Sequence, residues 1–162
     1  MEGTFKPGWL GSLAASIAAH GVSILEGHAE CDPLGGWTAD LVLERSPTGT
    51  LPSELDFVEL ADRDVSDYGG PRVELCVAST SHVPDHGGSL LVCVEGTDQL
   101  GFLATLLTRL AKVALFPVEL RIATISGRVS DRLWLRCPGG RAPDADALSA
   151  VTLALRPMLR PS

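Results

Sequence analysis

The chain of 162 residues has few basic side chains: 13 Lys and Arg stand against 20 Asp and Glu, which gives a net charge of -7. Proteins that bind nucleic acid neutralise its phosphates with clustered Lys and Arg. The acidic balance therefore argues against nucleic acid as a direct partner.

Paired cysteines are also missing. Cys31, Cys76, Cys93 and Cys137 stand far apart, and no two of them form a CxxC pair. Three of the four, at positions 76, 93 and 137, lie inside or at the end of apolar runs, where a free cysteine behaves as a small hydrophobic residue. We expect reduced core cysteines in a cytoplasmic protein, although the even count leaves a disulfide framework open.

The sequence has no long uninterrupted apolar run. Residues 7–25 carry no Asp, Glu, Lys or Arg, but glycine, serine and histidine recur throughout the segment. A membrane span needs about 20 predominantly apolar residues, and a signal peptide needs a basic start and a compact apolar centre. The spacing instead predicts an amphipathic helix, and we expect no membrane association.

Motifs of catalysis are absent as well: no nucleophile elbow, P-loop, dinucleotide fingerprint or His-Glu-x-x-His helix occurs. The acidic cluster of Glu59, Asp62, Asp64 and Asp67 is typical of a helix end that runs into a solvated connector. We therefore expect a protein that is not an enzyme, with no catalytic residue and no cofactor.

Two histidines, His82 and His86, flank a proline and an aspartate, and Gly-Gly follows them, which predicts a loop. With His28 and Cys31, the fold would have to gather such ligands into a metal site. The other interpretation is a solvated linker over residues 82–88. We expect no metal.

What the sequence does contain is an internal repeat. Residues 8–13 (Gly-Trp-Leu-Gly-Ser-Leu) and 101–106 (Gly-Phe-Leu-Ala-Thr-Leu) share the order glycine, aromatic, Leu, small, hydroxyl, Leu. The match continues in register: Trp9, Leu10, Leu13, Ala14, Ile17 and Ala18 align with Phe102, Leu103, Leu106, Leu107, Leu110 and Ala111. This spacing predicts two helices, each with one buried stripe.

The segments after the two helices match too. Residues 22–31 and 118–126 have strand patterns, and after a turn residues 37–44 and 129–136 form a second pair. Each copy thus contains a helix, a strand, a hairpin and another strand.

The rest of the chain completes each copy in part. Residues 89–95 predict a strand before the second helix, and residues 72–80 a strand with one buried face. Ser53 caps a predicted short helix, and Pro143-Asp144 opens another that Pro157 ends.

Together these elements predict an α+β protein of two ferredoxin-like βαββαβ modules with antiparallel sheets. The modules span residues 1–81 and 89–162, joined by the linker 82–88. The first lacks an evident first strand, because only residues 1–5 precede its helix, and the second lacks an evident last strand. Another strand of the chain or of a second subunit fills each gap, or the first copy is trimmed. Open apolar edges favour strand exchange or an oligomer, and we expect a homodimer.

At residues 8–13 and 101–106, followed by Gly27-His28-Ala29 and Ala123-Thr124-Ile125 in the next strands, the chain resembles a tandem of ACT domains. The resemblance is to the paired modules of nitrogen-sensing uridylyltransferases and of glycine cleavage system repressor-like proteins. It covers most of the chain and implies a regulatory module that binds an amino acid or a related small metabolite, commonly between two modules.

The family signature is an Asp-x-Pro-Gly turn before the first helix, and each copy keeps half of it. Phe5 stands in the place of Asp in the first copy, and Leu100 in the place of Pro in the second. The resemblance places ligand-binding residues at these turns: Lys6, Pro7, Gly8, Trp9, Asp98, Gln99, Leu100, Gly101, Phe102 and Leu103.

These turn residues have two physical interpretations. Gly8 and Gly101 let the backbone approach a ligand, or serve a tight turn alone. Asp98 accepts a hydrogen bond from an ammonium group, or caps the helix. The leading hypothesis is a regulatory protein that senses an amino acid. The alternative is a protein-interaction module that keeps the fold without binding a ligand.

Overall fold

The computed structural model describes residues 2–4, 8–32, 36–65 and 68–159. The strands are β1 (Glu2–Thr4), β2 (Val22–Cys31), β3 (Gly36–Arg45), β4 (Leu75–Val83), β5 (Ser89–Thr97), β6 (Phe116–Ile125) and β7 (Arg128–Arg136). The α-helices are α1 (Trp9–Ala19), α2 (Phe57–Asp62), α3 (Phe102–Lys112) and α4 (Ala145–Leu155). These elements make an α+β fold.

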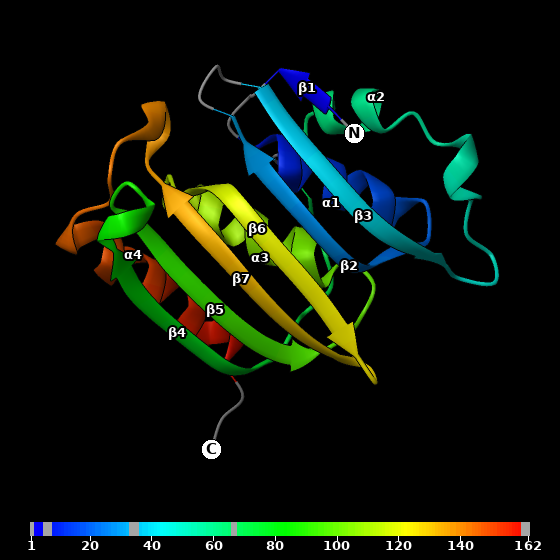
Figure 1. Cartoon of the computed structure of the whole chain (residues 1–162). Coiled ribbons are helices and arrows are strands. Elements are labelled where there is room, and N and C mark those ends of the chain that lie inside the picture. Colours follow the sequence, from blue (N-terminus) through cyan, green and yellow to red (C-terminus); the bar gives the residue numbers. More distant parts are fainter. Residues whose placement is uncertain (1, 5–7, 33–35, 66–67, 160–162) are drawn as a thin grey trace.

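The seven strands form one antiparallel sheet in the order β1-β3-β2-β6-β7-β5-β4. In Figure 1, α1, α3 and α4 lie behind this sheet, on the same face of it. Side chains alternate between the two faces of a strand, so every second residue points to the helices. In β7 these inward positions include Val129, Leu133 and Leu135, which are all buried in the core.

The repeated helices form where the sequence pattern predicts them. α1 and α3 are both 11 residues long, and each begins at the aromatic residue that follows a glycine. Leu13 and Ile17 of α1 and Leu106 and Leu110 of α3 are fully buried, as the predicted stripes require. The hairpins β2–β3 and β6–β7 follow. The predicted sequence of helix, strand, hairpin and strand is therefore confirmed in both halves.

The two halves join where β2 pairs with β6. The register pairs Glu26 with Ala123, Gly27 with Ile122, His28 with Arg121, Ala29 with Leu120 and Glu30 with Glu119. Under the alignment of the repeat, the first of these pairs is equivalent to the last, and the His28–Arg121 pair is equivalent to itself. The register is unchanged when the halves are exchanged, so the centre of the sheet has an approximate two-fold axis at this pair.

A single sheet takes the place of the two separate sheets that we expected. The strand predicted at 72–80 in the first half is β4, and it pairs along its length with β5 of the second half. The reason is a tight reversal within residues 82–88, where the 3₁₀ turn Pro84–His86 leads into two glycines with φ of 60° and 75°. Another strand of the chain thus fills the gap in the second half.

The gap in the first half is filled by a short strand that the sequence did not reveal. β1 pairs with β3 over its three residues, Glu2–Thr4. Three residues are too few for an alternating pattern to identify a strand from sequence. The strand conformation of β1 depends on pairing with β3, which lies more than 30 residues further along the chain.

The cap predicted at Ser53 is wrong. Pro52–Glu54 forms a 3₁₀ turn and Leu55 is extended, so α2 begins later, with Asp56 as its cap. The Asp56 carboxylate accepts hydrogen bonds from the amides of Val58 and Glu59, each at 3.1 Å. The cap at the start of α4 is Asp144, as predicted, and it accepts from the Ala147 amide at 2.9 Å.

The four cysteines are free, but they are less buried than we expected. Cys76 is exposed, and Cys31, Cys93 and Cys137 are partly buried. Cys76 lies on the edge strand β4, at a shift in its register with β5, which turns its side chain away from the core. Within the described residues, no helix has both the length and the apolar character needed to cross a membrane.

Candidate functional site

The turns before α1 and α3 have the same backbone conformation. Gly8 and Gly101 stand at the helix N-caps with φ of 85° and 82°, a left-handed conformation that favours glycine. A Cβ atom at position 101 would lie 2.5 Å from the Tyr68 hydroxyl oxygen. The tight turn therefore requires glycine at both positions. Lys6 and Pro7, the other candidates at the first turn, lie outside the described residues.

The first turn of α3 has backbone amides without helical acceptors. The Phe102 N–H donates back into the turn at 3.0 Å, and helical hydrogen bonding begins at the Thr105 N–H. The N–H groups between them, those of Leu103 and Ala104, have no acceptor within the helix, because the residues one turn earlier precede it. The N-cap residue, Gly101, has no side chain that could cap this end of the helix. The helix dipole gives it a partial positive charge.

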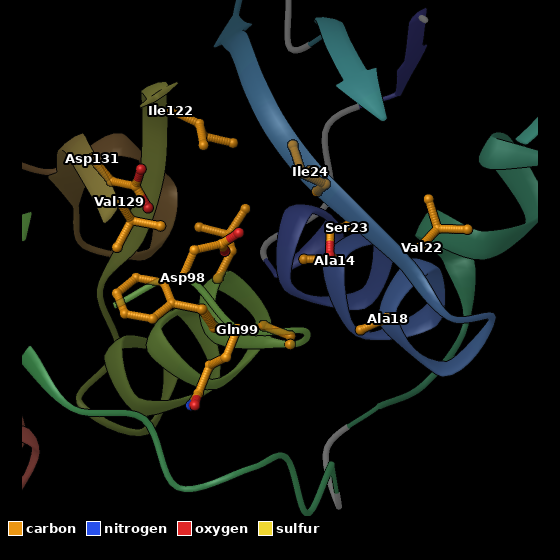
Figure 2. Close-up of a pocket in the computed structure, with 14 residues that line it drawn as sticks. Ala14, Ala18, Val22, Ser23, Ile24, Asp98, Gln99, Ile122, Val129 and Asp131 are labelled. Carbon is orange, nitrogen blue, oxygen red and sulfur yellow. The ribbon is translucent and has the colours of Figure 1, made fainter. Parts of the chain in front are cut away.

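A cavity of about 30 Å³ lies at this turn, where the two halves meet (Figure 2). Its first-half wall comes from α1 and the start of β2, and its second-half wall from the loop before α3, the first turn of α3, β6 and β7. Most of the lining is apolar, including Ala14, Ala18, Val22, Ile24, Phe102 and Ile122. A cavity of this volume holds one or two water molecules.

The buried carboxylate of Asp131 lines this cavity. Asp131 lies in β7 between the inward-facing residues Val129 and Leu133, and only 1% of its surface is exposed. Among the residues that the structure describes, neither carboxylate oxygen has a partner at hydrogen-bond geometry. Burial raises the pKa of Asp131 to about 7; the nearby Ala123 amide opposes this rise and the Asp98 carboxylate adds to it.

Asp131 was not among the sequence candidates. The signal that could have found it is the strand pattern of residues 129–136, in which a charged residue occupies one of the alternating inward positions. A charged side chain is almost never fully buried unless it is paired. An aspartate in the buried phase of a strand is therefore a candidate for a functional role.

The candidates at the second turn come together at the cavity with one exception. Asp98, Gln99, Gly101, Phe102 and Leu103 all line it. Leu100 does not belong to this lining and is 41% exposed.

Asp98 and Gln99 have different roles at the cavity. Asp98 makes no capping hydrogen bond to α3. Burial raises the pKa of Asp98, the Gln99 amide lowers it and Glu44 raises it further. The Gln99 side chain points away from Asp98 in Figure 2, and its amide donates to the Arg72 carbonyl at 2.8 Å. Asp98 and Asp131 are thus the two charged residues among those that line the cavity.

A larger groove, of about 510 Å³, lies at the first turn. It is formed by residues 8–12, by residues 63–65 after α2, by part of α3, and by Leu115 with the start of β6. Under the repeat, residues of this groove are equivalent to residues of the cavity: Gly8 to Gly101, Leu107 to Ala14, Ala111 to Ala18, Leu115 to Val22 and Pro117 to Ile24. Each turn is therefore closed by the helix and strand of the opposite half.

The inner end of the first-half site differs from its counterpart. Trp9 and Trp37 stack there, with ring centroids 3.9 Å apart and an interplanar angle of 13°. Matching the hairpin β2–β3 with β6–β7 by strand register makes Trp37 equivalent to Val129 and Ala39 to Asp131. The first half thus has an aromatic stack and an alanine where the second half has a buried carboxylate.

A second polar cluster lies around Glu119. Its carboxylate oxygens lie 2.7 Å from His86 Nε2, 3.5 Å from His28 Nε2 and 2.9 Å from Arg121 Nη2. Burial opposes ionisation, but hydrogen bonds from His86 and Arg121 hold the pKa of Glu119 below its usual value. His86 also stacks on Trp134.

The fold brings His28 and His86 to this one carboxylate and leaves the third histidine of the predicted set, His82, exposed on β4. In the part of the chain that the structure describes, no three His, Cys, Asp or Glu side chains are grouped so that they could hold a metal ion.

Comparison with known proteins gave no match: no protein-family model, no curated protein and no solved structure matches the chain. The geometry of the cavity and the internal repeat are therefore the basis for assigning a function.

Proposed function

We propose that the protein is a cytoplasmic regulatory protein of two ACT-like, ferredoxin-like modules that binds an amino acid or a similar small metabolite at the second turn. The observation that carries the proposal is the relation between the two turns. Each is closed by the helix and strand of the opposite half, and a two-fold register joins the halves. A site shared by two modules can couple binding to their arrangement.

The polar groups at the second turn suit a zwitterion. The amides of Leu103 and Ala104, which have no acceptor among the described residues, favour a carboxylate together with the helix dipole. Asp98 and Asp131 supply negative charge on the same cavity. Since the rest of the lining is largely apolar, these interactions act in a poorly solvated space, where they are stronger than in water.

The volume of the cavity suggests how binding would regulate. A space that holds one or two waters is too small for an amino acid, so the ligand enters only when the second turn moves away from α1 and β2. The ligand then has different affinities for the closed and open arrangements, and this difference is what shifts the equilibrium between them. Ligand binding thus shifts the protein toward the arrangement in which the two halves are further apart at the second turn.

The second candidate function is a protein-interaction module that keeps the fold without binding a ligand. The observation that favours it is the edge strand β4, which is nine residues long and stands at the end of the sheet. Such an edge offers backbone N–H and C=O groups to a strand of a partner or of a second copy. The expected homodimer is part of both proposals.

A thermal-shift screen against the twenty protein amino acids tests the first proposal. A ligand that binds the folded state alone at a concentration of 100 times Kd adds about 2.7 kcal/mol of stability, which raises Tm by several degrees. Ala18→Leu fills the cavity, and Ala111→Leu fills the equivalent place in the first-turn groove. We expect the shift to disappear in the first variant and to persist in the second.

Each leucine adds volume to a packed site and can lower the stability by about 1–3 kcal/mol, so each variant is compared with its own ligand-free Tm. Loss of the shift in Ala111→Leu alone would place the ligand at the first turn. If no amino acid shifts the folded wild-type protein, the sensing proposal is wrong and the interaction module becomes the better account.

A further inference from the structure

In the described part of the chain, no cation or side-chain donor compensates the burial of the Asp131 carboxylate. Burying a carboxylate without a hydrogen bond or a cation to compensate it lowers the stability of the fold. Among the described residues, neither oxygen of Asp131 has a partner at hydrogen-bond geometry, and the nearby Ala123 amide offsets only part of the cost of burial. The residue is nevertheless 99% buried and lies at a strand position that apolar residues otherwise occupy. The residue suits a role in which a group from outside the chain completes its interactions.

The cavity indicates the chemistry of that group. The two charged lining residues, Asp131 and Asp98, are both acidic, and most of the remaining wall is apolar. Mg²⁺ and Ca²⁺ require six or more oxygen ligands, which two carboxylates and an apolar wall do not provide. An ammonium group is compact, has a single charge and carries three donors, so it fits two carboxylates in a small space.

The first half shows that the feature is not part of the repeated framework. At the equivalent positions, alanine replaces Asp131, and the stacked rings of Trp9 and Trp37 occupy the neighbouring space. The fold therefore forms this arrangement without a buried carboxylate. The buried carboxylate in the strand is thus a feature of the second turn that the equivalent position of the first turn lacks.

We propose that Asp131 binds the protonated amino group of the ligand, so that of the two equivalent turns the second is the binding site and it selects amino compounds. This inference rests on the proposed function and extends it, because it assigns the residue that recognises the ligand and the group that is recognised. Asp98, which lies just before the N-terminus of α3, faces the same ammonium group. The amides of the first turn of α3 face the carboxylate of an amino acid.

The test uses calorimetric titration of the whole chain with an amino acid that shifts Tm and with its 2-hydroxy acid, in which a hydroxyl replaces the ammonium group. For L-alanine, the matched compound is L-lactate. A buried site built to bind one polar group rejects the analogue that lacks it. We expect the wild type to bind the hydroxy acid at least a hundredfold more weakly than the amino acid.

The matched variants are Asp131→Asn and Asp40→Asn. Asp131→Asn keeps the shape of the side chain and removes its charge, and we expect about a hundredfold loss of affinity for the amino acid, with discrimination against the hydroxy acid nearly abolished. Asp40 is exposed on β3, and its variant controls for the change in net charge. Circular dichroism and Tm establish that both variants are folded.

The outcomes separate the two proposals. Equal binding of the amino acid and the hydroxy acid by the wild type, or unchanged affinity in folded Asp131→Asn, would overturn the role of Asp131 while leaving a ligand site in place. Absence of binding of every amino acid by the wild type would overturn the proposed function, and this inference with it.

Discussion

Asp131 is a buried acidic residue in the second half of the molecule, and the equivalent position in the first half is an alanine. Burial raises the pKa of Asp131 to about 7, the Ala123 amide opposes the rise, and Asp98 adds to it. An unfolded chain releases this proton near the ordinary value of 3.8, whereas the folded chain keeps it until about pH 7. Between these values the folded state binds more protons, so its stability falls as the pH rises.

Asp131→Asn removes this dependence on pH. Each pH unit in the window corresponds to about 1.4 kcal/mol, so between pH 5 and pH 8 we expect the wild type to lose about 3 kcal/mol more stability than the variant. Urea unfolding at the two pH values measures the difference, in which the other titrating groups largely cancel. Parallel losses in the two proteins would show that Asp131 ionises normally in the fold.

The candidate site could be predicted from the sequence only where the halves agree. Comparing the repeats identified Gly101 and its neighbours because glycine, an aromatic residue and leucine recur in both copies. It did not identify Asp131, because its equivalent is Ala39 and the two hairpins differ in length. Asp131, the residue that we propose makes the site specific, is therefore a position at which the two copies of the repeat differ.

At the scale of elements, local patterns predict local structure well. The helices α1 and α3 begin at the predicted aromatic residues, and the hairpin strands were predicted to within two residues, because their periodicity and end signals lie within the elements themselves. The pairing of β4 with β5 was missed, because residues 82–88 were interpreted as a linker between two sheets, whereas the Pro84–His86 turn there closes a hairpin. The start of α2 was missed because Ser53 and Asp56 are both good caps, and Ser53 lies inside the 3₁₀ turn that precedes the helix.

The stack of Trp9 on Trp37 packs α1 against β3. Removing it tests whether these two rings fill the inner end of the first-half site. Trp37 is 3% exposed, and we expect Trp37→Ala to lower the free energy of unfolding by about 3–5 kcal/mol. Trp134 is only partly buried, beside His86 and Arg121, and Trp134→Ala should cost about 1 kcal/mol. Denaturant unfolding followed by circular dichroism measures both.

Similar losses in the two variants would contradict this account, because they would show that the stack packs no better than a tryptophan at the surface. A larger loss for Trp37→Ala supports a first-half site whose inner end is filled by the protein itself. The comparison also avoids the cavity, so it does not depend on a ligand.

At the scale of the whole molecule, an approximate two-fold arrangement carries an asymmetric pair of sites. The register of β2 with β6 and the equivalent linings of the two turns relate the halves. The aromatic stack and Ala39 on one side, and Asp131 on the other, distinguish them. Such an arrangement allows one half to bind the ligand while the other serves as the surface that closes over it.

The measurement that tests this central claim most directly is an amide NMR titration of the wild type with the amino acid that raises Tm most. We predict that the largest shifts lie at Ala18 and Ala104, on the two walls of the cavity, and that the equivalent residues Ala111 and Gly11 change little. Shifts of similar size at both pairs, or shifts confined to Ala111 and Gly11, would contradict the account.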